Sequence, residues 1–414
     1  MERSAILGII CLALALRLVV AFGVQHRLEN VWQRQFVISG DAEGYWELAG
    51  RLASGEPYAV HEPPRQVMRM PGYPLFLSMV IRTCGENLFA ARIATVLVGT
   101  LTVALVYVLG STLFSTRVGL AGAFLSAVSP QQIGSSVLLL SEMLFAFFLI
   151  LNLCCFAVWR KKRETISKLQ SHLWAGLTGV TIALATYVRP TWLPVVFVMG
   201  IYLFWQEKGA GRITLPLMIA GSCLLCLLPW AIRNQRLTGH WVWTTLWMGP
   251  SLYDGLNPDA DGTSQMAFFD RESVMSAQGM SEFEMNRHYR DRALEFVKEQ
   301  PDRAISLMAR HTLRYWSPWP NAEQVRANLL IPIAVAAFAI PFFLLSIYGA
   351  LRADEALWKL VVCLGPVLAF GIIHSVFVGS VRYRLPAEFP LAVLAGVGLV
   401  SLIERFSKRG GPAS

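Results

Sequence analysis

Two acidic residues stand where a carboxylate could do chemistry at the membrane surface. Asp41 opens a segment that continues with helical spacing through Tyr45, and Glu142 enters the long hydrophobic run that follows Ser141. An acid entering a membrane helix costs on the order of 2.5 kcal/mol or more unless it is paired or wetted. A carboxylate so placed can remove a proton from an incoming hydroxyl. Taken alone, Asp41 also fits a simple helix cap.

Five arginines lie at the ends of apolar runs and would meet the same surface. A guanidinium group there can hold a phosphate through charge-assisted, bidentate hydrogen bonds. Taken singly, each arginine also fits an anchor that snorkels to the lipid headgroups. The five are Arg69, Arg189, Arg233, Arg382 and Arg384. Together with the two acids, they would suit a lipid phosphate that carries a sugar.

The elements that must position these side chains are membrane-spanning helices. The chain of 414 residues is 55% hydrophobic and only 15% charged, with a mean hydropathy of +0.48. This composition is too apolar for an ordinary soluble domain of this length. Ten apolar runs are near the length that crosses a bilayer or somewhat shorter. We expect spans at residues 4–24, 90–113, 117–130, 143–159, 173–188, 190–205, 213–232, 329–349, 357–379 and 385–403.

The charge distribution predicts the orientation of these spans. Lysine and arginine are concentrated in the connections on the amino-terminal side, for example at residues 160–168 and in the tail after 403. The positive-inside rule makes that side cytoplasmic, and an even number of spans puts both termini there. The net charge of +9 is then mostly a topology signal and not a sign of nucleic-acid binding. The first loop, 25–74, and the long loop, 233–328, are expected to be extracytoplasmic.

Short helices are expected at the extracytoplasmic face. One interfacial helix should begin near Asp41, and residues 74–83 are apolar but too short to span. Ser281 begins a capping-box pattern that predicts a helix to about Gln300. Pro301 suits the first turn of a second amphipathic helix. Both helices would lie along the membrane surface or cap a cavity.

Cysteine and histidine usage gives little support for disulfides or metal. Nearly all of the seven cysteines lie inside apolar runs, which implies no disulfide framework. The Cys-x-x-Cys at 223–226 has no second pair and is interpreted as structural. His61 and Glu62 in the first loop and His240 at the start of the second leave a divalent metal ion open as a cofactor.

The polar segments also occur in a recognisable order. The sequence resembles the GT-C class of polyprenyl-phosphate-sugar-dependent glycosyltransferases, in the bacterial branch related to protein O-mannosyltransferases and aminoarabinose transferases. No single motif is highly specific for this class, but the order of the motifs along the chain and their placement by the membrane topology are specific. The matching segments are residues 40–45, 54–58, 69–77, 129–130, 141–142, 187–190, 229–234, 254–258 and 382–386.

The resemblance implies an all-α polytopic membrane protein, a GT-C-like bundle of about ten transmembrane helices with extracytoplasmic interfacial helices. It implies an inverting transferase in which Asp41 acts as general base or orients the acceptor. Glu142 matches a second acidic position at which relatives often have Asp. Arg69, Arg382 and Arg384 match basic positions that would bind the lipid phosphate. Some relatives use a divalent metal and others do not.

The sequence therefore predicts one GT-C-like domain over residues 1–414, a multi-pass protein of the inner (plasma) membrane. We expect it to move a sugar from a polyprenyl-phosphate donor to a hydroxyl of a lipid, glycan or protein acceptor, with inversion, on the extracytoplasmic face. A lipid-linked-sugar flippase or other membrane transporter is the main alternative, although the sequence lacks the inverted repeat typical of many transporters. A non-catalytic assembly subunit is a third interpretation.

Overall fold

A bundle of roughly aligned helices forms the body of the molecule in the computed structural model, which describes residues 2–266, 268–269, 279–320, 330–353 and 356–409. Seven of the described helices are long and apolar enough to cross a membrane. They are α1 (Glu2–Asn30), α4 (Leu88–Leu113), α7 (Glu142–Lys162), α10 (Gly211–Thr238), α17 (Leu330–Arg352), α18 (Leu357–Val376) and α19 (Val381–Arg409). The predicted polytopic all-α membrane fold is confirmed.

The other three predicted spans are helices of the same bundle, but they differ from the seven in length or polarity. α5 (Thr116–Val128) has 13 residues and α9 (Val195–Gln206) has 12. At 1.5 Å per residue each reaches roughly 20 Å, less than the hydrocarbon thickness of about 30 Å. α8 (Lys168–Val188) is long enough with 21 residues, but serine and threonine recur along it.

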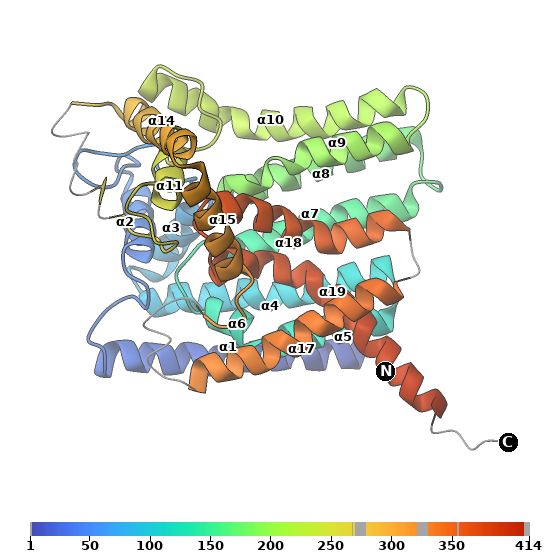
Figure 1. The fold of residues 1–414 in the computed structure, drawn as a ribbon. Helices are drawn as coiled ribbons and strands as arrows, with labels where there is room; N and C mark the ends of the chain where they lie inside the picture. Colours follow the sequence, from blue (N-terminus) through green and yellow to red (C-terminus); the bar gives the residue numbers. More distant parts are fainter. Residues whose placement is uncertain (1, 267, 270–278, 321–329, 354–355, 410–414) are drawn as a thin grey trace.

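The short helices gather at one end of the bundle, opposite the end where both chain termini lie (Figure 1). They are α2 (Asp41–Ser54), α3 (Gly72–Cys84), α11 (Met248–Gly255), α14 (Glu282–Glu299) and α15 (Pro301–Tyr315). Two smaller elements, α6 (Pro130–Ser135) and the 3-10 helix η1 (Pro190–Trp192), interrupt the connections between longer helices. Most of the polar sequence motifs therefore lie at this end.

Several of these short helices begin where the sequence predicts. α14 begins after Ser281, whose hydroxyl and backbone form a capping box with Glu284. Pro301 opens α15, because its missing N–H is not needed in a first turn. α2 begins at Asp41, but Gly40 is its N-cap residue and adopts a positive φ of 74°. The Asp41 carboxylate makes no cap hydrogen bond, so the helix-cap interpretation does not account for it.

Two helix boundaries differ from the prediction. α19 begins at Val381 instead of 385, so Arg382 and Arg384 lie in its first turn and not in a connection. Residues two apart on an α-helix point roughly 200° away from each other. α10 continues to Thr238, so Arg233 lies in this helix and not at the start of the long loop. Both differences decide which arginines reach the site.

Glycines allow the helices to pack backbone to backbone around α19. A Cβ atom at Gly349 would overlap the Leu394 carbonyl oxygen, and one at Gly122 would lie 2.9 Å from the Ala392 carbonyl oxygen. Small residues at such positions permit close helix approach, which drives association in lipid. α17 and α5 are therefore held tightly against α19, the helix that carries Arg382.

Candidate functional site

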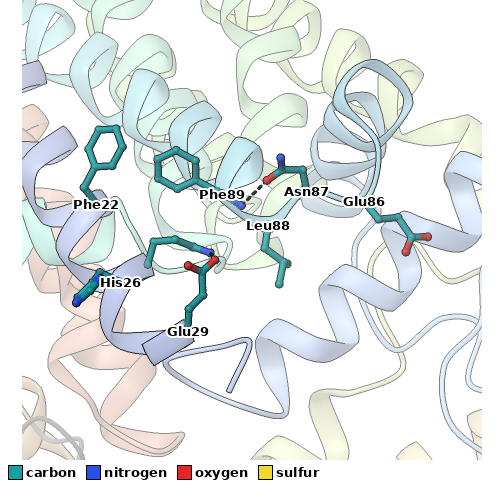
Figure 2. Close-up of a pocket in the computed structure, with 8 residues that line it drawn as sticks. Phe22, His26, Glu29, Glu86, Asn87, Leu88 and Phe89 are labelled. Carbon is teal, nitrogen blue, oxygen red and sulfur yellow. Dashed lines mark hydrogen bonds between the residues drawn. The ribbon is translucent and has the colours of Figure 1, made fainter. Parts of the chain in front are cut away.

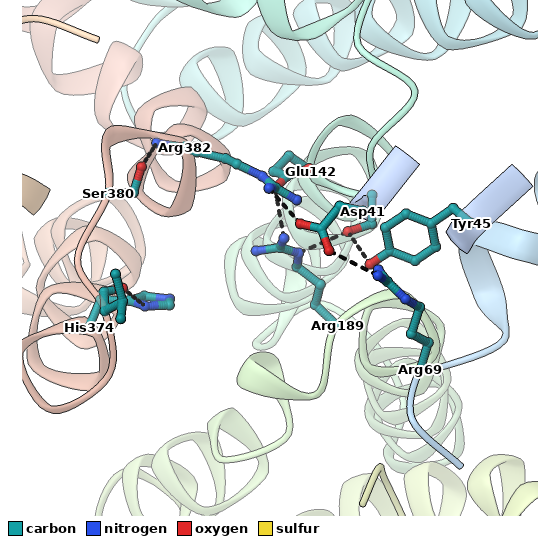
Figure 3. Close-up of polar contacts among 10 residues, drawn as sticks. Asp41, Tyr45, Arg69, Glu142, Arg189, His374, Ser380 and Arg382 are labelled. Carbon is teal, nitrogen blue, oxygen red and sulfur yellow. Dashed lines mark hydrogen bonds and ion pairs between the residues drawn. The ribbon is translucent and has the colours of Figure 1, made fainter. Parts of the chain in front are cut away.

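Asp41 lies between two arginines from distant parts of the chain. Its Oδ1 accepts a hydrogen bond from Arg69 Nη2 at 2.9 Å, and its Oδ2 accepts one from Arg382 Nη1 at 2.7 Å (Figure 3). The Asp41 side chain is still 41% exposed. The carboxylate is thus held by charge on both oxygens while one face remains open.

Glu142 is the buried partner of the same group. Its Oε1 accepts a hydrogen bond from Arg189 Nη2 at 2.7 Å and contacts Arg382 Nε. The Glu142 side chain is 3% exposed, and its Oε2 has no hydrogen-bond partner among the described residues. Arg382 therefore links both carboxylates. Of the charged side chains predicted to meet here, all but Arg233 and Arg384 do meet.

The fold explains why these side chains can approach one another. Gly44 leaves room for Arg69, since a Cβ there would lie 3.3 Å from Arg69 Nη2. The Arg69 guanidinium lies over the Tyr45 ring, 4.3 Å from its centroid. Gly72 packs against the Tyr187 carbonyl, with a Cβ that would lie 2.6 Å from that oxygen. α3 is thereby fixed against the end of α8, where Arg189 follows.

Neutral side chains complete the cluster. The Ser141 hydroxyl accepts hydrogen bonds from Tyr45 OH at 3.1 Å and Arg189 Nε at 3.0 Å. Tyr383 lies beside Arg189 and Arg382, whose guanidinium carbons are 5.3 Å and 5.7 Å from its ring centroid. Their position in the sequence could have identified them, because Ser141 and Tyr383 are direct neighbours of the predicted site residues Glu142 and Arg382.

Arg233 holds the first loop and does not face the cavity that Asp41 lines. Its Nη1 donates to the Gln66 carbonyl at 3.1 Å, while the Glu282 carboxylate accepts from the Gln66 and Val67 N–H groups at 2.9 Å and 3.0 Å. Burial raises the pKa of Glu282. These hydrogen bonds hold in place the segment that leads to Arg69. Arg233 is therefore corrected from a phosphate-binding to a positioning residue.

Arg384 is also turned away from the site. It is completely buried, and its Nε donates to Glu388 Oε1 at 2.7 Å. Its Nη1 donates to the carbonyl oxygens of Tyr315 and Ser317. The helical start of α19 explains this, because it directs Arg384 to the side opposite Arg382. The expectation that Arg384 binds the lipid phosphate is wrong.

The charged cluster lines a cavity of 540 Å³. Asp41, Arg69, Arg189 and Arg382 form one part of its wall, and residues of α11 and α18 form another. Thr191, Pro194 and Ile373 also line a second, mostly apolar cavity of 400 Å³ between α7, α9 and α18. The cavity with the charged cluster is thus adjacent to an apolar groove among the membrane helices, and the two share these three wall residues.

A separate hollow of 640 Å³ lies between the end of α1 and the start of α4 (Figure 2). Its polar side chains include Glu29, Glu86 and Asn87. Asn87 caps α4 through its Oδ1, which accepts hydrogen bonds from the N–H groups of Phe89 and Ala90. Among the described residues no arginine lines this hollow, so it lacks the cations found in the cavity around Asp41.

The donor set around Asp41 does not fit a divalent metal ion. Both carboxylates are already paired with guanidinium groups, and a dication would lie beside three positive charges. Among the described residues, no three His, Cys, Asp or Glu side chains are close enough to share a metal. His240, one of the metal candidates, stacks on Phe283 with 3.6 Å between ring centroids. His61 and Glu62 join no such group, and no step is assigned to a metal.

The electrostatics of the cluster keep Asp41 charged. Removal from bulk water would raise the pKa of Asp41, but the charges of Arg382 and Arg69 outweigh this effect and hold the pKa well below its usual value. A carboxylate in this state is a weak base and a strong hydrogen-bond acceptor. The group can therefore bind an anion through its arginines and a hydroxyl through Asp41.

Part of the chain is similar in sequence to glycosyltransferases. Residues 64–232 match the family described as Dolichyl-phosphate-mannose-protein mannosyltransferase. Undecaprenyl phosphate-alpha-4-amino-4-deoxy-L-arabinose arabinosyl transferase of Pseudomonas aeruginosa is 29% identical over 161 residues, which is 38% of this chain and 29% of the relative. The match thus spans less than a third of that relative's length.

Solved structures share the fold over nearly the whole chain. The Archaeoglobus fulgidus oligosaccharyltransferase in the apo form has a TM-score of 0.59 at 14% identity and covers 98% of this chain and 51% of its own. ArnT from Cupriavidus metallidurans bound to undecaprenyl phosphate has a TM-score of 0.58 at 15% identity, with coverages of 97% and 62%. These comparisons confirm the GT-C-like fold and the resemblance to polyprenyl-phosphate-dependent glycosyltransferases of the GT-C class.

Proposed function

We propose that the chain is a membrane glycosyltransferase that moves a sugar from a polyprenyl-phosphate carrier to an acceptor hydroxyl, with inversion. The observation that carries this proposal is the pair of adjacent cavities that share wall residues. One is lined by three arginines and a carboxylate, and the other is an apolar groove among the membrane helices. A phosphate that is covalently linked to a long hydrocarbon chain would fill both.

The groove supplies a path for the polyprenyl chain. Along α18 its lining extends from Leu357, at the end of the bundle far from the site, to Ile373, which also lines the polar cavity. These positions are roughly 24 Å apart at 1.5 Å per residue. Phe156, Trp192 and Trp358 contribute aromatic surface to the same groove. A carrier lying here would present its phosphate to Arg69, Arg189 and Arg382.

The transfer step uses charges of both signs. The acceptor oxygen attacks the anomeric carbon, a new carbon–oxygen bond forms, and the bond to the phosphate oxygen breaks. The arginines stabilise the negative charge that develops on the departing phosphate, and such preorganised stabilisation usually lowers an activation barrier more than any other single effect. The proton of the acceptor hydroxyl passes to Asp41. Attack from the face opposite the phosphate inverts the anomeric centre.

Donor binding would also prepare the base. Asp41 and a bound phosphate compete for the same two guanidinium groups, Arg69 and Arg382. When the phosphate takes these hydrogen bonds, the pKa of Asp41 rises because the positive charge is shared with a second anion. The carboxylate thus becomes a better base only when a donor is present, which limits side reactions of the empty enzyme.

The orientation of the protein belongs to the same proposal. The short helices and the cavity lie at the end of the bundle opposite the termini. The positive-inside distribution of lysine and arginine favours cytoplasmic termini. We therefore place the site on the extracytoplasmic side of a bacterial inner membrane. The acceptor would be a lipid, glycan or protein hydroxyl that reaches this face.

The proposal is tested with membranes that contain the expressed chain and radiolabelled undecaprenyl-phosphate sugars. Asp41→Asn should lower the transfer rate by about 10²- to 10⁴-fold, because a positioned base contributes about that much. Glu47→Gln is the matched control, since Glu47 lies in the same helix α2 and pairs with Arg51 away from the site. Equal transfer by Asp41→Asn and wild type would overturn the proposal. Sugar uptake into vesicles without a covalent product would favour the transporter.

A further inference from the structure

The lining of the cavity around Asp41 contains groups of different hydrogen-bonding character. Arg69, Arg189 and Arg382 present donors that suit a phosphate. Asp254 and His374 line the same cavity and can accept hydrogen bonds, the first through its carboxylate and the second through its ring. We call these two residues, together with the hydroxyl groups of Thr244, Thr245 and Ser251, the Asp254 group.

Asp254 is a carboxylate of α11 with no cationic partner among the described residues. It is only 6% exposed, and burial raises its pKa. Its Oδ2 accepts a hydrogen bond from Ser264 Oγ at 2.7 Å and its Oδ1 accepts one from Gln265 N at 2.8 Å. Each carboxylate oxygen can accept a further hydrogen bond. The remaining capacity is available to a ligand in the cavity.

His374 presents a second acceptor from α18. Its Nδ1 lies 3.2 Å from the Val378 carbonyl oxygen, and a carbonyl only accepts, so the proton of the neutral ring is on Nδ1. The ring stacks on Tyr383 with 4.3 Å between centroids and an interplanar angle of 8°. In Figure 3 the ring extends from its helix toward the arginine cluster. In this tautomer Nε2 carries a lone pair that can accept a hydrogen bond.

Close backbone packing fixes these two acceptors relative to each other. Gly255 follows Asp254, and a Cβ there would lie 3.1 Å from the Val376 carbonyl oxygen and 3.3 Å from Val378 N. The same turn, 376–378, supplies the carbonyl that orients His374. The end of α11 and the end of α18 therefore meet at a close contact, where a Cβ atom would require the neighbouring atoms to shift. A rigid wall of this kind can discriminate between ligands.

We propose that the Asp254 group binds the sugar of the donor lipid. Asp254 and His374 would select sugars that present hydroxyl or amino hydrogens and reject sugars that carry a carboxylate. The inference rests on the proposed use of a polyprenyl-phosphate sugar. Because the sugar is bonded directly to the phosphate, it must lie next to the arginines. A sugar carboxylate facing Asp254 would place a second negative charge beside a carboxylate that is only 6% exposed, which is unfavourable.

Binding measurements on the full chain in nanodiscs test this assignment. The probes are undecaprenyl phosphate, undecaprenyl phosphate-glucose and undecaprenyl phosphate-glucuronate, followed by calorimetry. Wild type should bind the glucose lipid at least tenfold more tightly than the glucuronate lipid. Asp254→Asn should weaken glucose-lipid binding about 10- to 100-fold, as for loss of hydrogen bonds to a charged group, and should reduce the rejection of glucuronate. Binding of undecaprenyl phosphate itself should not change.

Two further variants separate recognition from folding. His374→Asn keeps a donor near the Val378 carbonyl and removes the Nε2 acceptor, so it should weaken only the binding of sugar-bearing lipids. Asp261→Asn is the control, because Asp261 lies in the same loop as Ser264 but does not line the cavity. If Asp254→Asn does not fold, His374→Asn carries the test alone.

The outcomes distinguish this inference from the proposed function. Equal affinity of wild type for the two sugar lipids would overturn the assignment of sugar binding to the Asp254 group. Wild-type selectivity in both variants would overturn it as well. If the selectivity is as expected but no donor yields a covalent product, the transferase proposal fails while the sugar-binding assignment stands. If a sugar is transferred but the variants keep the wild-type selectivity, the transferase proposal stands and the sugar-binding assignment fails.

Discussion

Arginines enter this apolar bundle in two kinds of surroundings. The cavity arginines, Arg69, Arg189 and Arg382, bind carboxylates beside an open cavity. The bundle arginines, Arg17, Arg92 and Arg384, are at most 1% exposed. Arg17 donates to the carbonyl oxygens of residues 13, 126 and 127, and Arg92 donates to those of residues 35 and 137.

The two sets of arginines differ in whether their hydrogen-bond partners can be exchanged for a ligand. A bundle arginine satisfies fixed backbone carbonyls, so its removal leaves buried acceptors without a donor. A cavity arginine can exchange its carboxylate partner for an incoming anion without loss of hydrogen bonding. An arginine within a membrane helix is therefore not in itself evidence of a site. Its partners and its access to a cavity are the informative features.

The largest effect is expected for Arg384→Ala, because it leaves Glu388 charged and unpaired at a buried position. Breaking a buried ion pair from one side typically costs about 3 to 5 kcal/mol. The variant should give a lower yield of folded protein and a lower Tm in thermal unfolding. The folded fraction should transfer sugar at the wild-type rate.

The double variant Arg384→Met with Glu388→Leu sharpens this test. Replacing both partners with apolar side chains removes the unpaired charge, so most of the lost Tm should return. If the single variant keeps its Tm but loses transfer, Arg384 belongs to the functional site and the division into two sets of arginines is wrong.

Arg382→Ala should have the second-largest effect, on activity instead of folding. Loss of one preorganised donor to a developing anion typically lowers kcat by about 10²- to 10³-fold. Arg189 still pairs with Glu142 and Arg69 still pairs with Asp41, so Tm should change little. Radiolabel transfer per mole of folded protein measures the effect. Arg290→Ala, which removes an exposed pair with Asp291, is the control, and a large fall in Tm with normal kcat would make Arg382 a bundle arginine.

The smallest effect concerns pH. The pKa of Asp41 lies below its usual value, so the carboxylate is ionised throughout the range from pH 5 to 8. Its contribution to folding stability is complete above the unfolded pKa of about 3.9 and is lost only as pH falls through the lower folded value. Arg69→Met removes one positive charge and should raise the pKa of Asp41. The acid limb of its pH–rate profile should therefore begin at higher pH than in wild type.

The sequence identified the charged centre well because membrane topology limits where polar residues can lie. Asp41, Arg69, Glu142, Arg189 and Arg382 come together as expected, although no contact among them was visible in the chain. Arg384 was misassigned because its direction depends on whether residues 381–384 are helical, and hydropathy alone does not locate a helix start within a few residues.

Other parts of the site depend on tertiary packing and had no clear sequence signal. His374 is a single histidine in an apolar run, and its position beside the cavity follows from stacking on Tyr383. Asp254 lay in a recognised segment, but its lack of a cationic partner among the described residues became visible only in three dimensions. The groove between α9 and α18 likewise arises from the spacing of helices and not from any local pattern.

The pairing of Asp41 with Arg382 has a consequence for biosynthesis. The two residues are 341 positions apart in the chain. At about 5 to 20 residues per second, a ribosome needs roughly 20 to 70 s to pass from one codon to the other. Throughout that interval the first loop is already translated while its second arginine has not been made. An unfinished chain therefore lacks the ion pair between Asp41 and Arg382, and the charged cluster is complete only after the last helix, α19, has been made.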